Sequence, residues 1–504
     1  MASVMKTLLL NPPSFDKFDG GAGSRWPVSR EVESYWYPVW LTYAAGMLPG
    51  SRLVDSSPQK FTPQMVINLA KDYEFLVVFT STVGFESDCR LIRAMKEQNA
   101  SLKIAFVGPH VMNQPHQSLK ATEDLDFVVR GEFDHAIVEF AQGKPLQDIL
   151  GISYRANGHI LDTLPRPQLH TEELDALPFA TEVYKRDLTI ENYTVPFLLY
   201  PFISLYTTRG CPALCTFCQW PQTISGHAWR VRSTDNVVRE IAQAIQMFPQ
   251  AKEFFWDDDT FNIRKDRVLE ICAKFKALKF RWSCNARVHS DYETIRAMAE
   301  GGARLFIVGF ESGDDQILKN IKKGATVEMA RTFVKNCKKL GIRVHGDFIL
   351  GLPGETKQTM QKTIDFAKEL DCETVQVSMA HAFPGTELYT YLVENNFLRT
   401  EALTDGSGRQ LPHMEYPGLS REEMLEGVRR FYDEYYLRPR VAWRIVKEAL
   451  WDSHERKRLY HEAVEFLRSR ADWKKKARQG VGGRRPMVAV PAAAETRSGS
   501  SAND

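Results

Sequence analysis

The chain has 504 residues and a formal net charge of +2. Its length exceeds the size at which one hydrophobic core stops growing, so the sequence predicts two or more domains. The balanced charge argues against a general nucleic-acid-binding protein, and eight cysteines without an even, closely spaced framework argue against a secreted disulfide-rich fold. The longest apolar stretch, Val195 to Tyr206, is shorter than the roughly 20 residues of a membrane helix. The first apolar run, near Thr7, predicts a β-strand and not a signal peptide.

Residues 1–145 alternate short apolar runs with amphipathic stretches. The predicted strands are Thr7–Asn11, Arg52–Asp55, Phe75–Thr80, Lys103–Gly108 and Phe127–Arg130. Helical patterns lie between several of these strands, and this alternation predicts a Rossmann-like domain in which helices cover both faces of a parallel sheet. Ligands of such sheets gather at the loops that follow the carboxyl ends of the strands.

Those loops carry small residues, which let a backbone approach a bulky planar ligand closely. The candidates for ligand contact are Ser81, Thr82, Gly108, His110, Gly131 and Glu132. Each loop taken alone is more typical of an ordinary turn. Together and in this order, the loops resemble the cobalamin-binding domain that precedes many radical SAM domains, which implies cobalamin as a cofactor. The DxHxxG motif, whose histidine ligates cobalt in several cobalamin enzymes, is absent, and we expect His110 to be a loop residue and not a cobalt ligand.

Residues 146–193 contain several prolines and few periodic runs, which predicts a linker across a domain junction. Strands and helices alternate again over residues 194–399. The predicted strands are Phe202–Thr207, Glu253–Trp256, Phe280–Cys284, Leu305–Val308, Val344–Ile349 and Thr374–Met379. Six strand-to-loop units in one direction predict a partial (β/α)6 barrel of the TIM type. Its reactive groups are expected at the carboxyl ends of the strands, and its open side would admit a large substrate.

Cys211, Cys215 and Cys218 follow the first of these strands with the spacing CxxxCxxC. Three thiolates suit a cubane 4Fe-4S cluster with one open iron, whereas an electron-transfer cluster or a structural zinc site takes four ligands. No fourth cysteine stands nearby in the sequence. We expect the remaining five to be small buried hydrophobic residues: Cys89, Cys272, Cys284, Cys337 and Cys372. An oxygen-sensitive cluster requires a reducing compartment, so we expect a cytoplasmic protein.

This spacing, with Phe217 just before the third cysteine, resembles the radical SAM superfamily. In that superfamily the open iron binds the amino and carboxylate groups of S-adenosylmethionine, and an electron cleaves the cofactor to a 5'-deoxyadenosyl radical. The resemblance implies that Glu311 and Arg287 hold the ribose and carboxylate region, that Asp257 or Asp258 holds the amino group, and that a reductant such as flavodoxin or ferredoxin is needed. The full set expected around S-adenosylmethionine is Phe217, Asp257, Asp258, Arg287, Glu311, Ser312, Gly351, Pro353 and Gly354.

Three of these features have other interpretations. The turn Gly351–Gly354, expected to hold the adenine through its backbone, is also typical of an ordinary tight turn. The acidic triplet at residues 257–259 is compatible with a solvated loop, a helix N-cap or a magnesium site. Phe217 and Trp220 would form an apolar wall that excludes water and oxygen, and simple core packing explains them nearly as well.

Residues 400–480 form a predicted helical C-terminal region, in which Ser420 begins a capping box, and residues 481–504 form a predicted disordered tail. The helical region combines many basic residues with Tyr435, Tyr436, Trp443, Trp451 and Trp473. Such a surface can lie on anionic lipid, so one interpretation of this region is peripheral contact with the inner membrane. The alternative is an ordinary amphipathic cap on the barrel.

Nearly the whole chain resembles the hopanoid-biosynthesis-associated radical SAM proteins of bacteria. The resemblance is carried by the segments Leu9–Phe15, Phe18–Arg25 and Cys218–Thr223. It implies a hopanoid lipid substrate: the amino-sugar head group of glycosylated bacteriohopanetetrol would be converted to a cyclitol ether by a radical ring contraction. The alternative is a cobalamin-dependent radical SAM methyltransferase acting on a lipid or another secondary metabolite. A non-catalytic cluster or cobalamin sensor is a third hypothesis.

Overall fold

The computed structural model describes residues 4–15, 34–403 and 411–444. A seven-stranded sheet forms its N-terminal half, with the strand order β2-β1-β3-β4-β5-β6-β7. The strands are β1 (Thr7–Asn11), β2 (Arg52–Asp55), β3 (Phe75–Phe79), β4 (Lys103–Val107), β5 (Phe127–Val129), β6 (Ile152–Ala156) and β7 (His159–Asp162). β1 to β5 are the five strands predicted from the sequence, and they are parallel.

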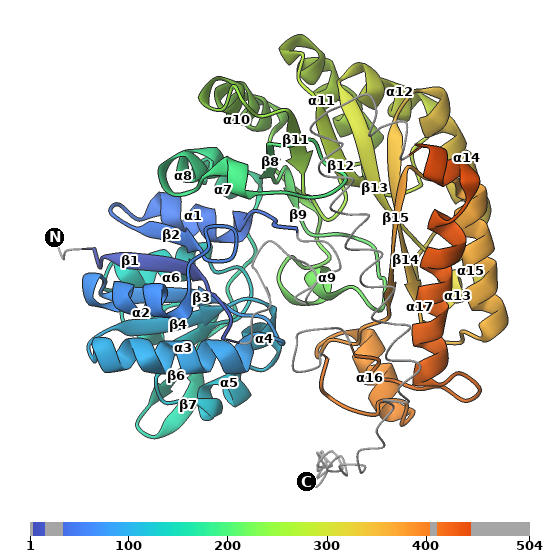
Figure 1. Ribbon diagram of the computed structural model, residues 1–504. Helices are drawn as coiled ribbons and strands as arrows, with labels where there is room; N and C mark the ends of the chain where they lie inside the picture. The colour runs from blue at the N-terminus through green and yellow to red at the C-terminus, as the bar shows by residue number, and fades with distance from the viewer. Residues whose placement is uncertain (1–3, 16–33, 404–410, 445–504) are drawn as a thin grey trace, which may run out of the picture.

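Helices cover both faces of this sheet (Figure 1). They are α1 (Val39–Met47), α2 (Pro63–Leu69), α3 (Phe85–Gln98), α4 (Pro109–Asn113), α5 (Pro115–Ala121) and α6 (Asp134–Ala141), with short 3-10 turns η1 (Ala70–Asp72) and η2 (Leu146–Asp148). Successive strand residues point to opposite faces. Leu8 and Leu10 belong to the apolar cluster that includes α2 and α3, whereas Leu9 belongs to the cluster that includes α1. Burial on both faces explains the continuous apolar runs of these strands.

The segment 146–193, expected as a linker, contains regular structure. β6 and β7 form an antiparallel hairpin that pairs with β5 and extends the first sheet. The hairpin turns at Asn157-Gly158, a dipeptide that favours two-residue hairpin turns and was the signal available in the sequence. The segment continues with α7 (Thr171–Ala176), α8 (Ala180–Asp187) and η3 (Ile190–Asn192). The prediction of a linker is therefore wrong for residues 152–162, which form the hairpin and extend the first sheet.

A second sheet has the order β15-β14-β13-β12-β11-β8 and is parallel throughout. Its strands are β8 (Phe202–Leu205), β11 (Glu253–Trp256), β12 (Trp282–Ala286), β13 (Ala303–Glu311), β14 (Arg343–Leu350) and β15 (Thr374–Met379). The helices on its outer face include α10 (Thr234–Met247), α11 (Lys265–Leu278), α12 (Tyr292–Glu300), α13 (Asp315–Asn320), α14 (Val327–Lys339) and α15 (Lys357–Leu370). Open edges at β8 and β15 make this the predicted partial barrel.

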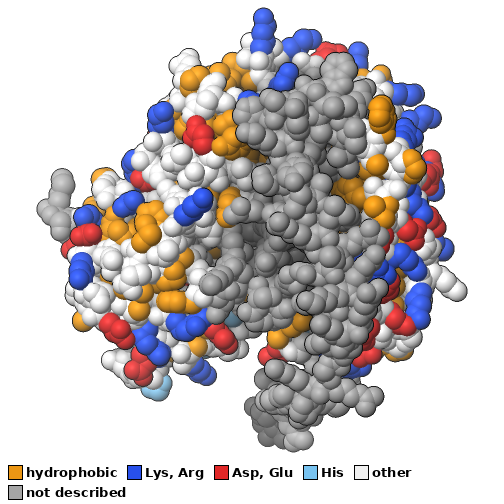
Figure 2. Space-filling view, in the orientation of Figure 1, with side chains coloured by type: hydrophobic (Ala, Val, Ile, Leu, Met, Phe, Trp, Pro, Cys, Tyr) orange, Lys and Arg blue, Asp and Glu red, His pale blue; other side chains and the backbone are white. Residues whose placement is uncertain are grey.

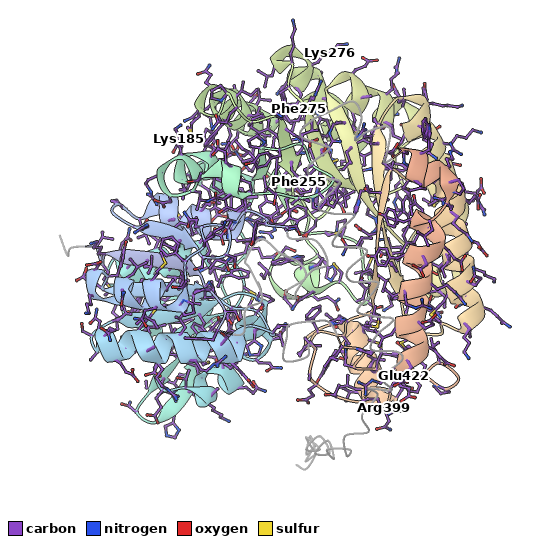
Figure 3. All side chains as sticks on the ribbon, viewed as in Figure 1. Lys185, Phe255, Phe275, Lys276, Arg399 and Glu422 are labelled. Carbon is purple, nitrogen blue, oxygen red and sulfur yellow. The ribbon has the colours of Figure 1, made fainter. Side chains whose placement is uncertain are left out.

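The concave side of the second sheet faces the N-terminal half, and the short helix α9 (Gln219–Thr223) lies between the two in Figure 1. Phe255 on β11 and Phe275 on α11 are fully buried in the packed interior, whereas Lys185, Lys276, Arg399 and Glu422 lie toward the periphery (Figure 3).

The C-terminal helix α17 (Arg421–Tyr436) packs along β15 and begins with the predicted capping box at Ser420. Tyr435 is fully buried and donates to Cys372 O, and Tyr436 donates to Val375 O at 2.9 Å. These two tyrosines therefore attach α17 to the backbone at β15, and membrane contact through this region stays a prediction. Trp443 is 67% exposed.

The tryptophans Trp451 and Trp473, the segment 18–25 and the tail 481–504 lie outside the described residues. Within the ranges that are described, no helix is both long and apolar enough to cross a membrane. Figure 2 shows acidic and basic side chains interspersed along the right-hand edge of the molecule.

Candidate cluster and cofactor site

The three cysteines lie on one loop, residues 210–218, which we call the cluster loop. The chain reaches it from β8 through β9 (Thr208–Arg209), which pairs antiparallel with β10 (Arg230–Val231). Gly210 follows with a φ of +88°, and a Cβ at this position would lie 2.1 Å from Ala228 O. Backbone sterics therefore require glycine beside the first cysteine.

Polar side chains from neighbouring strands surround the cysteine sulfurs. Cys211 Sγ lies 3.7 Å from Thr260 Oγ1, which follows β11. Arg287 follows β12 and donates from Nη1 to Cys215 Sγ at 3.7 Å. Cys211 and Cys215 are buried, and Cys218 is half-buried. Of the five other cysteines, four are buried as expected, and Cys89 is only half-buried.

The donor set of the cluster loop fits a cluster better than a single ion. Among the described residues, no group of three or more His, Cys, Asp or Glu side chains converges as the ligands of one metal ion. The carboxylates of the acidic triplet serve separate partners: Asp258 accepts from Thr207 and Thr208, and Asp259 accepts from Ser225. A cubane separates its cysteines more widely, because each thiolate binds a different iron. Three soft sulfur donors on one short loop meet that requirement.

Gln222, on α9, donates hydrogen bonds to three backbone carbonyl groups of the cluster loop. Its Nε2 lies 3.3 Å from Cys215 O, 3.2 Å from Thr216 O and 2.7 Å from Cys218 O. Its Oε1 accepts from the backbone N–H of Glu387 at 2.8 Å, where α16 (Glu387–Glu394) begins. Since α16 follows β15, this one side chain joins the cluster loop to the opposite edge of the open barrel.

Replacing Gln222 by Leu should loosen the cluster loop without removing a cysteine. Three carbonyl oxygens lose their shared donor, at a cost of about 1–3 kcal/mol. We expect an iron chelator to bleach the reconstituted cluster several-fold faster than in the wild type. Gln243→Leu, on α10, removes an amide whose bond to Glu182 is exposed and should leave the rate unchanged. Equal rates in Gln222→Leu and wild type would contradict this role.

Glu311 and Arg287 come together near Cys215, as the resemblance implied. Glu311 ends β13 with a φ of +65°, a strained conformation for a non-glycine residue. Its Oε1 accepts from Lys323 Nζ at 2.7 Å, and both side chains are buried. Burial raises the pKa of Glu311, although the Lys323 ammonium opposes the shift. Arg287 Nη2 donates to Lys323 O, so one carboxylate and two cations lie beside the cluster loop.

Asp258 and Ser312 do not face this group. Asp258 is fully buried and accepts from the N–H groups of Thr207 and Thr208 at 2.6 and 2.9 Å, so it holds the turn that leads to the cluster loop. Ser312 lies 3.2 Å from Thr363 on the outer helix α15. Asp257 accepts from Asn285 Nδ2 at 3.2 Å on the concave face. Of the two aspartates, Asp257 is thus the candidate for the amino group.

The turn Gly351–Gly354 is held from inside by Glu355. The N–H groups of Gly351 and Leu352 both donate to the Glu355 carboxylate, and Tyr416 donates to Gly351 O at 3.0 Å. Burial raises the pKa of Glu355 to about 8. These backbone groups of Gly351 and Leu352 are therefore already used within the turn, which favours the tight-turn interpretation over an adenine contact through them. Pro353 O likewise accepts from Asn320 Nδ2 at 2.9 Å.

The loops of the first sheet divide into open and buried positions. A Cβ on Gly131 would meet no atom within 4 Å, whereas one on Gly108 would lie 2.5 Å from Thr80 O. Ser81 accepts from Gly84 N at 3.2 Å and is buried, and Thr82 is half-buried. These small residues leave room for a planar ligand at Gly131.

His110 was expected on a loop and lies instead on the short helix α4, directly after β4. Its ring stacks on Phe85 at 4.2 Å, and burial lowers its pKa to about 4. Contact of His110 with cobalamin stays a prediction.

Glu132 serves the contact between the two halves and not a ligand. Its carboxylate accepts from Arg230 Nη1 at 2.8 Å and from Leu169 N at 2.9 Å. Arg209, which directly precedes the cluster loop, pairs bidentately with Asp134 at 2.8 and 3.0 Å and lies 3.3 Å from Glu132. Together these four charges form a buried interdomain network with equal numbers of each sign.

Aromatic rings continue the same contact. Trp220 on α9 stacks on Trp40 of α1 with centroids 6.4 Å apart, and the Arg209 guanidinium lies 4.5 Å from the Trp40 ring centroid. Phe217 is half-buried against the same core. The Trp40–Trp220 pair thus joins the two halves next to the cluster loop.

Sequence reasoning missed Lys323, Gln222 and Thr260. A buried lysine cannot be told from an exposed one in a chain with 65 basic residues. Gln222 had a weak signal, because it stands four residues after Cys218, within reach of that carbonyl on one helical turn. Thr260 follows the acidic triplet directly and was overlooked beside it.

Two family descriptions match the chain: "Radical SAM superfamily" over residues 205–367 and "B12 binding domain" over residues 25–141. An uncharacterized methyltransferase of Pyrococcus horikoshii is 30% identical over 450 residues, which cover 87% of this chain and 94% of that protein.

Two solved structures share the fold at 16% sequence identity, each with a TM-score of 0.66. One is TsrM from Kitasatospora setae, a radical S-adenosylmethionine methyltransferase with cobalamin and a 4Fe-4S cluster bound, and the match covers 92% of this chain and 99% of TsrM. The other is OxsB, a cobalamin-dependent S-adenosylmethionine radical enzyme, and the match covers 92% of this chain and 72% of OxsB. The predicted fold class is confirmed.

Proposed function

This chain belongs to the radical SAM superfamily and carries an N-terminal B12-binding domain, and on that basis we propose that it is a cobalamin-dependent radical methyltransferase. The predicted cofactors are confirmed by the two family matches: a 4Fe-4S cluster, S-adenosylmethionine and cobalamin. Methyl transfer was the alternative drawn from the sequence. It is supported by relatives that are named as methyltransferases.

One observation carries the proposal: the carboxyl-end loops of the first sheet meet the cluster loop of the second. Glu132, which follows β5, contacts Arg209 beside Cys211, and α4, which follows β4, contacts α9. Ligands of both sheets are expected at these ends. A cobalamin at Gly131 and an S-adenosylmethionine at the cluster loop would therefore be neighbours across one site.

When bound, cobalamin supplies a cobalt centre that carries a methyl group, and the cluster with S-adenosylmethionine supplies a carbon-centred radical. The protein's own residues bind, orient and shield. Arg287 and Lys323 would balance the carboxylate of S-adenosylmethionine, and Glu311 would accept from its ribose hydroxyl groups. Trp220 and Phe217 keep water from the interdomain side of the cluster loop.

The expected hopanoid ring contraction has no support among these relatives, so it is not part of the proposal. Radical SAM chemistry needs a one-electron reductant, and flavodoxin or ferredoxin stays a prediction for that role. A lipid substrate, a cytoplasmic location and a peripheral membrane contact also stay predictions.

The test is a turnover assay with S-adenosylmethionine that carries a trideuterated methyl group. Protein reconstituted anaerobically with iron, sulfide and cobalamin is incubated with a strong reductant and with polar and lipid extracts of the source cells. We expect a product heavier by one trideuteromethyl group, formed together with S-adenosylhomocysteine and 5'-deoxyadenosine. Cys218→Ala is the control and should form none of the three.

Two other results would redirect the assignment. Deoxyadenosine formed with a changed lipid, without S-adenosylhomocysteine or the labelled methyl group, would contradict the methyltransferase proposal. It would favour the ring-contraction hypothesis instead. A reconstituted wild type that never cleaves S-adenosylmethionine under these conditions would favour the sensor hypothesis.

A further inference from the structure

The concave face of the second sheet carries a cluster of hydrogen-bonding side chains on β14 and β15. α17 covers the opposite face, where Tyr432 bonds to Val377 and the ring of Phe431 lies 5.2 Å from that of Phe348. Because side chains alternate along a strand, His345, Asp347 and Gln376 point the other way, into the barrel. Asp347 and Gln376 are direct cross-strand neighbours.

These three side chains have unused hydrogen-bonding capacity. His345 is 4% exposed, and its Nε2 makes no hydrogen bond, although it lies 3.2 Å from Asp347 Oδ1. The side chain of Asp347 is 36% exposed. Neither Asp347 nor Gln376 has a side-chain hydrogen-bond partner within the described parts of the chain. A buried imidazole nitrogen without a hydrogen bond is costly, and it points to a ligand that completes the set.

The rest of His345 is held firmly. Its Nδ1 lies 2.6 Å from Thr374 Oγ1, and its ring stacks on Phe197 with centroids 3.9 Å apart. The ring is therefore fixed by two neighbours while Nε2 stays available. Fixed orientation with an unused polar atom is typical of a binding residue supported by its surroundings.

The cluster adjoins the residues proposed for S-adenosylmethionine. On its other side, Asp347 pairs with Gly309 of β13. A Cβ on Gly309 would lie 2.2 Å from Glu311 Oε1 and 3.0 Å from Lys323 Nζ, so glycine leaves the space in which this ion pair lies. A molecule held at Asp347 would thus lie beside the ribose end of S-adenosylmethionine, where a methyl acceptor must be.

We propose that His345, Asp347 and Gln376 bind the polar end of the methyl acceptor, and that this end donates hydrogen bonds, as an ammonium group or adjacent hydroxyl groups do. The carboxylate of Asp347 accepts hydrogen bonds. In the described structure its ion-pair neighbour is His345 Nε2 at 3.2 Å, and no Lys or Arg lies within ion-pair distance of it. It therefore favours a donor or a cation and disfavours an anion. The Gln376 amide supplies both a donor and an acceptor. This inference rests on the proposed function for the identity of the bound molecule as the acceptor.

The test measures binding and does not require turnover. Three-carbon probes of similar size are titrated calorimetrically into the holoprotein loaded with S-adenosylmethionine: 2-amino-1,3-propanediol, 1,3-propanediol and malonate. We expect the amino diol to bind in the millimolar range, as suits so small a ligand, the neutral diol several-fold more weakly, and malonate not measurably. Asp347→Asn should weaken binding of the amino diol about tenfold, and Gln376→Leu several-fold. S-adenosylmethionine affinity should stay unchanged.

Asp365→Asn is the matched control, since Asp365 lies exposed on α15 and pairs with Lys368. It should bind all three probes as the wild type does. Gln376 is exposed, so we expect Gln376→Leu to fold. It can therefore test the inference even if Asp347→Asn fails to fold. Malonate binding as tightly as the amino diol, no binding of the amino diol, or wild-type affinity in the folded variants would overturn the inference. Failure of methyl transfer alone would appear in the turnover assay and would leave this binding pattern intact.

Discussion

Cys215→Ala should abolish both the 4Fe-4S cluster and the cleavage of S-adenosylmethionine. Three thiolates hold three irons, and loss of one leaves an iron without a protein ligand while the open iron still needs its own free position. Cys215 is buried on the cluster loop, and its sulfur accepts from the Arg287 guanidinium. A guanidinium cannot bind iron in place of the lost thiolate, so the loop offers no replacement ligand at this position. We expect the cluster's absorbance in the blue region of the spectrum to be missing from the reconstituted variant. Formation of 5'-deoxyadenosine should fall to background.

Cys337→Ala is the matched control for that experiment. Cys337 is also buried, but it lies on α14 and burial raises its thiol pKa, so it behaves as a small apolar residue. Iron and sulfide per chain, the absorbance and the cleavage rate should all match the wild type. Retention of a reconstituted cluster in Cys215→Ala would refute the assignment of the cluster ligands.

Arg209→Met should lower the stability of the folded protein strongly, by about 3–5 kcal/mol, because it breaks a buried ion pair from one side. The Arg209 guanidinium faces Asp134 and Glu132, and all three side chains are at most 3% exposed. Without it, the Asp134 carboxylate loses a bidentate partner, and Glu132 keeps Arg230 as its cationic partner beside the N–H of Leu169. The two halves of the molecule meet at this network, so we expect separation of the halves to accompany unfolding.

The measurement is denaturant unfolding of the anaerobic holoprotein, followed by tryptophan fluorescence. The midpoint should move to clearly lower denaturant in Arg209→Met. Arg264→Met removes the exposed pair with Asp266 and should leave the midpoint where it is, because surface pairs contribute little. A midpoint for Arg209→Met equal to that of Arg264→Met would mean that the network does not hold the halves together.

The sequence by itself predicted the cysteines of the proposed cluster, the parallel strands of both sheets and the order of the two sheets along the chain. The spacing of Cys211, Cys215 and Cys218 is local, so chain geometry alone brings three thiolates onto one loop. The central strands are buried on both faces and therefore appear in the sequence as continuous apolar runs between helices. This pattern can be recognised without knowledge of tertiary contacts. The hairpin of β6 and β7 was missed because its strands lie at the edge of the sheet, where Arg155 and His159 are exposed and the apolar run is broken.

Only the tertiary structure decided which polar residue does what. Asp257 and Asp258 are adjacent and chemically identical, yet the pleat turns one toward the concave face and the other into the turn at Thr207. Glu132 was expected at a ligand and instead meets Arg230, 98 residues away along the chain. Lys323 gains its role from Glu311 and Arg287, which reach it from separate strands. Residue type and spacing predict where a strand ends, whereas side-chain direction and distant partners follow from packing, and packing depends on the whole chain at once.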